Sequence, residues 1–173
     1  MTWWFAACQK PNEHMKQQAI ARQLQLTKPT GSLAILENIA IQLAALQGTT
    51  QPNIERPWIC IFAGDHGVME ENISAYPQAV TRQMLQNFAT GGACISVIAR
   101  QYQAHLQVVD CGTVGDAYEY AGVERHCIRA GTVNFAKACA MTEQECADAM
   151  ALGRQSVEDA IAQQASIYVA GEM

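Results

Sequence analysis

Apolar residues at helical spacing predict two helices in the first fifty residues of the chain. Residues 12–26 are polar with a thin apolar stripe, and a stronger stripe begins after the Pro29 and Gly31 turn. We expect Ser32 to cap the second helix and Gly48 to end it. The apolar positions of this second helix are Leu33, Leu36, Ala40, Leu43 and Leu46.

Short continuous apolar runs dominate the rest of the chain and predict buried strands. These runs cover residues 58–63, 105–110 and 166–170. A shorter strand is expected within 124–129. Helical patterns separate the runs, at 78–89, at 92–102 and after Thr142.

The last helix is predicted to begin at a capping box formed by Thr142 and Glu145. Four of its residues are expected to face the core: Cys146, Met150, Val157 and Ile161.

The order of these elements predicts an α/β fold with a mainly parallel sheet flanked by helices. Residues 1–48 form an N-terminal helical segment, which we expect to belong to a smaller helical subdomain. Residues 49–173 form the α/β part. With 173 residues, the chain is long enough to bury a substantial core.

Composition favours a globular domain and argues against a protein that binds nucleic acid or membranes. Hydrophobic residues make up 50% of the chain and charged residues 16%, as in globular domains. The net charge is −5 and no basic tract is present, which argues against a nucleic-acid partner or an anionic membrane surface. No apolar run approaches the roughly 20 residues that span a bilayer. We therefore expect a cytoplasmic protein.

The cysteines do not form a recognisable metal or redox motif. There are seven, and no two stand in a C-x-x-C pair. Most lie within apolar runs, where a free thiol behaves as a small hydrophobe. Reduced thiols in a cytosolic protein are the expectation.

Acidic residues stand at the ends of three predicted strands. Asp65, Asp110 and Glu172 would share one edge of a parallel sheet, where ligands of α/β proteins bind. Acids also follow strands simply as turn formers and helix caps. The two interpretations are even for Asp110, and the local sequence does not decide for Glu172. For Asp65, with His66 beside it and glycines on both sides, we favour a functional role.

The Asp65–His66 pair does not by itself define a chemistry. His66 could be a general acid or base, a metal ligand or a structural histidine. A metal site needs more ligands than this pair, and no further histidine stands at a suitable spacing. The glycine-rich nucleotide-binding fingerprints are absent. Tyr76 and Pro77 follow in the next loop and suit the mouth of a pocket for a flat apolar ligand, or ordinary loop packing.

A series of short motifs runs along the chain from about residue 26 to the last residue. In chain order they are Lys28-Pro29-Thr30-Gly31-Ser32-Leu33, Leu36-Glu37, Ala63-Gly64-Asp65-His66-Gly67-Val68, Ser74-Ala75-Tyr76-Pro77-Gln78, Val80-Thr81, Asn87-Phe88, Gly91-Gly92-Ala93, Val108-Val109-Asp110, Gly131-Thr132, Asn134, Ala140-Met141-Thr142 and Gly171-Glu172-Met173. Taken together, they are similar to the motifs of the nicotinate-nucleotide–dimethylbenzimidazole phosphoribosyltransferase family. The resemblance departs at two turns, where Thr30 and the Ala138-Cys139 pair replace residues usual in the family.

The resemblance implies a reaction. The phosphoribosyl group of nicotinate mononucleotide passes to 5,6-dimethylbenzimidazole, giving nicotinate and α-ribazole 5′-phosphate for the lower ligand of cobalamin. The pyridinium leaving group is already cationic, so its departure needs no acid. Positioning and a general base do the work, and no metal or other cofactor is required.

The resemblance also implies a Rossmann-like fold, a homodimer and roles for particular residues. Tyr76, Pro77 and Met84 would form part of the benzimidazole pocket wall, and Glu172 would lie near the ribose and phosphate of the nucleotide. Asp65 and His66 would shape the pocket or support the groups that touch the ligand.

Members of this family are about twice as long as this chain. Residues 49–173 would be the first half of the phosphoribosyltransferase domain, and the general base would lie beyond residue 173. We therefore expect a truncated chain that is inactive or nearly so by itself. Two alternatives stay open: a non-catalytic fragment that binds ligand or partner subunits, and a metal-dependent phosphohydrolase using Asp65 and His66.

Overall fold

A computed structural model describes residues 3–173, so the first two residues of the predicted N-terminal segment lie outside the described residues. The chain divides into two compact units, with the division between Asn53 and Ile54. The first unit contains a 3-10 turn, η1 (Trp3–Phe5), and two helices, α1 (Glu13–Gln23) and α2 (Ile35–Gln47).

Helices α1 and α2 pack through small residues. Ala19 of α1 and Ala44 and Ala45 of α2 are buried. Asn12 caps α1 by accepting a hydrogen bond from the Met15 amide, and its own amide donates to the Ala45 carbonyl, at 2.8 Å. The apolar stripe predicted for α2 is therefore only partly buried, because the alanines make the close contact and Leu36 and Leu46 stay exposed.

The start of α2 differs from the prediction, whereas its end agrees. The predicted cap at Ser32 is wrong: residues 30–34 form turns, and the helix begins at Ile35 after Ala34, which has a φ of 48°. Gly48 ends the helix in the left-handed conformation, as expected.

The second unit is built on one parallel sheet. Its strands are β1 (Pro57–Gly64), β2 (His105–Gly112), β3 (Glu124–Arg125) and β4 (Ile167–Glu172), in the spatial order β3-β2-β1-β4. Every neighbouring pair is parallel. The predicted α/β fold is confirmed, although β3 is only two residues long. The chain moves outward from β1 to β2 and β3 and then returns to the other side of β1, so the strand order reverses between β1 and β4.

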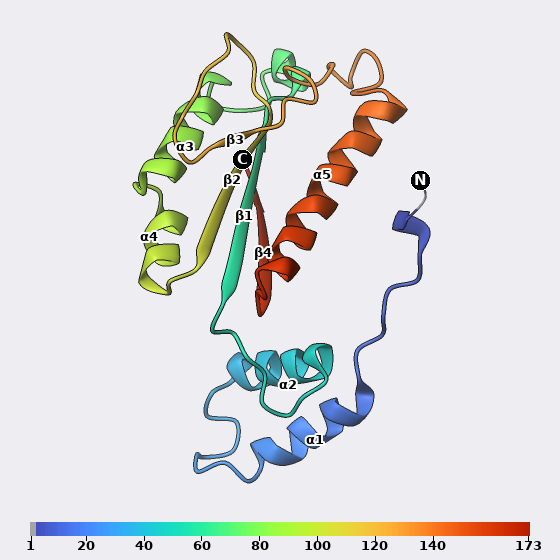
Figure 1. Ribbon diagram of the computed structural model, residues 1–173, viewed down its shortest axis with the longest axis vertical. Helices are drawn as coiled ribbons and strands as arrows, with labels where there is room; N and C mark the ends of the chain where they lie inside the picture. Colours follow the sequence, from blue (N-terminus) through green and yellow to red (C-terminus); the bar gives the residue numbers. More distant parts are fainter. Residues whose placement is uncertain (1–2) are drawn as a thin grey trace. The chain divides into compact units, whose positions relative to one another are not determined.

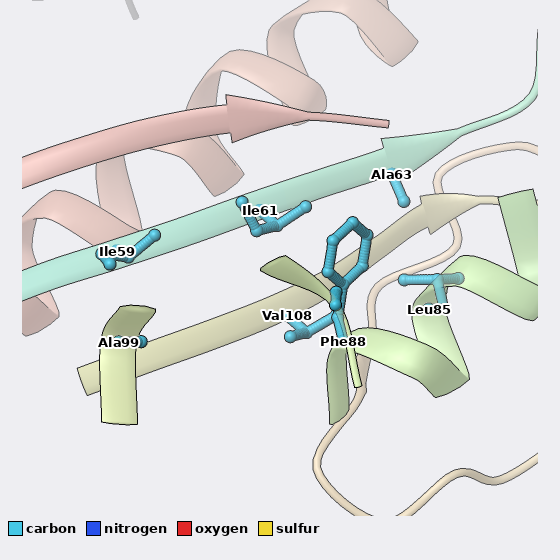
Figure 2. Close-up of a cluster of buried hydrophobic side chains, with 8 residues drawn as sticks. Ile59, Ile61, Ala63, Leu85, Phe88, Ala99 and Val108 are labelled. Carbon is cyan, nitrogen blue, oxygen red and sulfur yellow. The ribbon is translucent and has the colours of Figure 1, made fainter. Parts of the chain in front are cut away.

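Helices cover both faces of the sheet (Figure 1). On one face lie α3 (Ala79–Thr90) and α4 (Cys94–Gln101), and on the other lies α5 (Glu143–Ala162); a short 3-10 turn, η2 (Gly67–Glu71), follows β1. The core on the α3 face contains Ile59, Ile61, Leu85, Phe88 and Val108 (Figure 2). A second cluster lies between the sheet and α5, with Trp58, Cys60, Val109 and Ala160 at its centre.

Helix α5 begins at the predicted capping box, but it buries a different face from the one expected. Both bonds of the Thr142–Glu145 box are present. The buried residues are Ser156 and Ala160, whereas Cys146, Val157 and Ile161 are exposed. Small side chains let the helix approach the sheet closely, and Ser156 Oγ hydrogen bonds to Gln107 and Tyr168 beneath it. These polar contacts across the sheet override the apolar stripe.

The cysteines are free thiols, as expected, but most are not buried. Cys60 is buried in β1 and Cys111 is half-buried, whereas the others are exposed. The expectation that most behave as buried hydrophobes is therefore wrong, because most lie on outer helix faces and loops.

Candidate functional site

The carboxyl ends of β1, β2 and β4 bring the three acids together at one edge of the sheet. Ala63, two residues before Asp65, lies opposite Asp110, and Phe62 lies opposite Glu172. This edge contains the point where the strand order reverses. In open α/β sheets that is where ligands bind.

Asp110 is a structural anchor. Its side chain is fully buried and accepts hydrogen bonds from the amides of Gly112 and Thr113, the Thr113 hydroxyl and the Tyr118 hydroxyl, at 2.8–3.0 Å. Arg125 adds an ion pair at 3.6 Å. Burial is the main cause that raises the pKa of Tyr118 to about 12, and the hydrogen bond to Asp110 is the next. The hydroxyl therefore keeps its proton and remains a donor. These contacts hold the loop after β2 in place.

Asp65 joins three loops through both its backbone and its side chain. The carboxylate oxygen Oδ2 accepts a hydrogen bond from the Val114 amide at 2.8 Å. Its backbone amide donates to the Gly112 carbonyl, and its carbonyl accepts from the Thr132 amide. Asp65 is also buried. The geometry therefore suits a residue that shapes the site from behind its surface.

His66 is the exposed member of the pair, and it lies between two cavities. The Gln78 side chain donates to its backbone carbonyl at 3.0 Å, which ties the loop before α3 to the β1 end. The next residue, Gly67, has no room for a side chain, because the Thr132–Asn134 segment approaches its backbone closely. A Cβ at this position would lie 2.5 Å from the Thr132 carbonyl oxygen. The glycine therefore makes room for the loop that closes the site beside His66.

The larger cavity at this edge has a volume of about 470 Å³. Its floor is the β1 end with Asp65 and His66, and its outer wall is the loop containing Tyr76 and Pro77. Tyr76 is 70% exposed, so its ring is available to a ligand. Apolar residues complete the wall: Ile73, Val80, Phe135 and Met173.

A smaller cavity of about 120 Å³ lies on the other side of His66, beneath the start of α5. Cys111, Ile128 and Met141 line it, together with Arg129, which contacts Glu145 at 3.3 Å. Burial raises the pKa of the Cys111 thiol to about 11, so it stays protonated near neutral pH. A further cavity lies at the opposite edge of the sheet, around His105 and Asp159, away from the strand carboxyl ends.

Two of the predicted site residues do not line the larger cavity. Met84 is partly buried and packs against the core cluster of the α3 face. Glu172 is exposed at the end of β4. Conversely, prediction from the sequence missed Ile73, Phe135 and Met173. Of these three, only Met173 could have been predicted from the sequence, because it directly follows a predicted strand and so lies at the edge where ligands are expected.

No metal-binding cluster occurs at this edge or elsewhere in residues 3–173: no three His, Cys, Asp or Glu side chains lie close enough to hold an ion. In the same part of the chain, none of the helices has the length and apolar character needed to cross a membrane.

The fold and the cavity define the class: a doubly wound α/β protein with a mostly apolar cavity near the point where its strand order reverses, which is where ligands of such proteins bind. A family model described as phosphoribosyltransferase matches residues 8–173. The chain therefore belongs to this phosphoribosyltransferase family.

Relatives of known name agree with this assignment. The chain is 52% identical over 172 residues to the nicotinate-nucleotide–dimethylbenzimidazole phosphoribosyltransferase of Pseudomonas fluorescens (strain SBW25), and 54% identical to that of Pseudomonas putida (strain W619). Each match covers 99% of this chain and 49% of the relative. The chain thus spans about half the length of these relatives.

A solved structure supports the same fold. The crystal structure of the corresponding enzyme from Thermus thermophilus superposes with a TM-score of 0.84 at 42% identity. The match covers 94% of this chain and 49% of that chain.

Proposed function

We propose that this chain provides the base-binding half of an enzyme that transfers phosphoribosyl from nicotinate mononucleotide to 5,6-dimethylbenzimidazole. Nicotinate and α-ribazole 5′-phosphate are the products. The observation that supports this most directly is the cavity of about 470 Å³ walled by Tyr76 and Pro77. Small-ligand pockets are typically about 300–1,000 Å³ and mostly apolar, which suits a planar benzimidazole.

The residues at this edge have distinct proposed roles. Tyr76 and Pro77 contact the face of the benzimidazole, and Met84 supports that wall through the core. Asp65 holds the floor in place. His66 lies at the cavity rim, where it orients the base. Glu172 faces the ribose and phosphate of the nucleotide from the end of β4.

The chemistry requires little of these residues beyond positioning. The nicotinate group leaves without protonation because its ring nitrogen is cationic in the nucleotide. A benzimidazole nitrogen attacks the anomeric carbon as the glycosidic bond breaks. The other ring nitrogen then loses its proton to a general base, which by family resemblance lies outside residues 1–173. Holding the two rings in line contributes most to the rate.

Benzimidazole binding tests the proposal directly. The Tyr76→Ala substitution should weaken the binding of dimethylbenzimidazole about 2–12-fold, since an aromatic contact contributes about 0.5–1.5 kcal/mol. Tyr76 is 70% exposed, so the fold should be unaffected. A fluorescence titration with the base measures the dissociation constant.

Tyr102→Ala is the matched control for this titration. Tyr102 is 71% exposed and lies at the end of α4, outside the cavity. This variant should bind the base like the wild type. Equal binding by the wild type and Tyr76→Ala, or no binding by the wild type, would remove the support for this function.

A second candidate is a non-catalytic fragment that binds ligand or partner subunits. It is favoured by one observation, namely that the chain spans about half the length of its relatives. The isolated chain is expected to turn over little in either case, so base binding with no product even when the unmatched half of a relative is supplied would distinguish this candidate from the enzyme.

We also propose a cytoplasmic location and a homodimer. The location is supported by the free cysteines, five of which are exposed and would be at risk of oxidation elsewhere. The dimer rests on the family resemblance. Sedimentation equilibrium of the purified chain tests it, and a monomer at all concentrations would contradict it.

A further inference from the structure

The larger cavity contains a second exposed aromatic ring besides Tyr76. Phe135 lies in the loop that precedes α5 and lines the same cavity. Phe135 is 63% exposed, although a phenylalanine ring gains free energy when it leaves water. None of the roles in the proposed function involves this ring, so its place at the cavity calls for a role of its own.

The loops that carry the two rings are hydrogen bonded to neighbouring residues at the end of β1. The Gln78 side chain donates to the His66 carbonyl, which fixes the loop before α3 with the first ring. The Gly67 amide donates to the Thr132 carbonyl at 3.0 Å, which fixes the start of the loop with Phe135. The floor of the cavity therefore anchors both rings, although they come from separate loops.

Asn134 directly precedes the second ring and fixes the loop through its side chain. This residue is only 4% exposed. Its side-chain amide donates to Glu71 at 2.7 Å and to Glu70 at 3.3 Å. Its side-chain oxygen accepts from the Ala136 amide at 3.0 Å, and Lys137 forms ion pairs with the same two acids. The backbone on both sides of the ring is therefore tied to η2.

Two aromatic rings at one cavity suit a planar aromatic ligand. Such a ligand gains from each ring through offset-stacked or edge-to-face contacts, in addition to the area that it buries. Aromatic side chains also lose little conformational entropy on binding, because they have only two side-chain torsions. A ring that is already held in place by its loop loses less still.

We propose that Phe135 is a second aromatic contact for the base, and that Asn134 is the positioning residue that holds Phe135 at the cavity. Tyr76 and Phe135 each contact the planar ligand, and the affinity of the cavity for a flat base depends on both rings. The identity of the base rests on the proposed function. The ring contacts themselves rest on the geometry of the cavity and its loops.

Binding of 5,6-dimethylbenzimidazole to variants of the ring tests the first part. Phe135→Ala should weaken binding about 2–12-fold, the effect of one aromatic contact. Phe135→Leu keeps the apolar volume without the ring and should also weaken binding. Phe135→Tyr keeps the ring, so this matched control should bind like the wild type. Urea midpoints verify that the variants are folded, as expected at an exposed position.

NMR measures the contact between the base and the ring directly. The chain has four phenylalanines, so selective labelling of their rings gives few signals. A nuclear Overhauser effect should connect the protons of the bound base with one labelled ring. This effect should disappear in Phe135→Tyr, although the affinity is kept, and the disappearance assigns it. A role of Phe135 in folding alone would not produce the effect.

A charge change at Asn134 tests the positioning role. Asn134→Asp places a third carboxylate against Glu70 and Glu71, so it should release the loop and weaken base binding as much as Phe135→Ala does. Adding Glu71→Gln should restore binding, because the new amide donates to the new carboxylate with the roles exchanged. Asn72→Asp adds the same charge at an exposed position after η2, and this control should bind like the wild type.

The outcomes separate this inference from the proposed function. Wild-type affinity in both Phe135→Ala and Phe135→Leu would overturn the ring contact, and so would a saturated complex without the Overhauser effect. A double variant, Asn134→Asp with Glu71→Gln, that binds more weakly than the wild type would overturn the positioning role, whether or not Asn134→Asp alone is folded.

Two further results concern the proposed function. Absence of base binding by the wild type would overturn this inference and the proposed function together. Binding through both rings, with no product when the unmatched half of a relative is supplied, would support the ring contacts and count against the proposed function only.

Discussion

At the scale of single residues, two acids with similar sequence settings have different surroundings. Asp65 and Asp110 both stand at the ends of apolar strands. Asp110 is wholly enclosed by donors from its own loop, whereas Asp65 connects separate loops beside an exposed histidine. Both side chains are buried, so the difference lies in their partners: the Asp110 carboxylate accepts hydrogen bonds from Gly112, Thr113 and Tyr118, whereas that of Asp65 accepts one from the Val114 amide. Asp110 therefore stabilises the loop after β2, and the site-shaping role of Asp65 stays a prediction.

Removing the Asp110 side chain should destabilise the protein strongly. Asp110→Ala leaves the buried amides of Gly112 and Thr113 without acceptors, and we expect a loss of about 3 kcal/mol in the free energy of unfolding. Tyr118→Phe removes only one of the bonds and should cost about 1 kcal/mol. Urea unfolding measures both. Similar losses in the two variants would show that Asp110 is not the centre of this network.

At the scale of elements, close approach of backbones decides which glycines matter. Gly112 ends β2 at the point where residue 129 crosses it, and a Cβ there would lie 1.7 Å from the Arg129 carbonyl. Gly153 lies inside α5, with nothing within 4 Å of the added atom. The two glycines look alike in the sequence but face different constraints, because one meets another backbone and the other meets open space.

Alanine at these two glycines should have opposite effects on stability. Gly112→Ala forces the loop at Arg129 away from the strand and should lower the free energy of unfolding by about 3 kcal/mol. Gly153→Ala should raise it by about 0.5–1 kcal/mol, because alanine is the better helix former. Chemical denaturation of both variants measures the difference. A stabilising Gly112→Ala would contradict the close approach at this loop.

At the scale of the whole molecule, the cavity of about 470 Å³ lies at the carboxyl end of β1. The β1 end forms its floor, with Tyr76, Pro77, Phe135 and Met173 around it. The relatives that carry the named activity are about twice as long as this chain. Under the proposed function, this chain alone should bind the base, whereas turnover should need the longer polypeptide.

Turnover by the 173-residue chain should consequently be weak. By family resemblance the general base lies outside this chain, and loss of such a base alone costs about 10²–10⁴-fold in rate. We expect the chain to form α-ribazole 5′-phosphate at least that much more slowly than the Pseudomonas fluorescens (strain SBW25) relative. Product formation measured by chromatography under identical conditions checks this. Comparable rates would place the base within residues 1–173.

Periodicity in the sequence was sufficient to predict the parallel α/β fold, most element boundaries and the edge where Asp65, His66, Tyr76 and Pro77 meet. Those features depend on local apolar spacing, turn residues and caps, which act over a few neighbouring positions. The inward face of α5, the packing of Met84 on the core and the contribution of Phe135 required the tertiary structure. They depend on contacts between segments far apart in the chain, such as Ser156 with Gln107, and no local pattern encodes which distant partner a side chain meets.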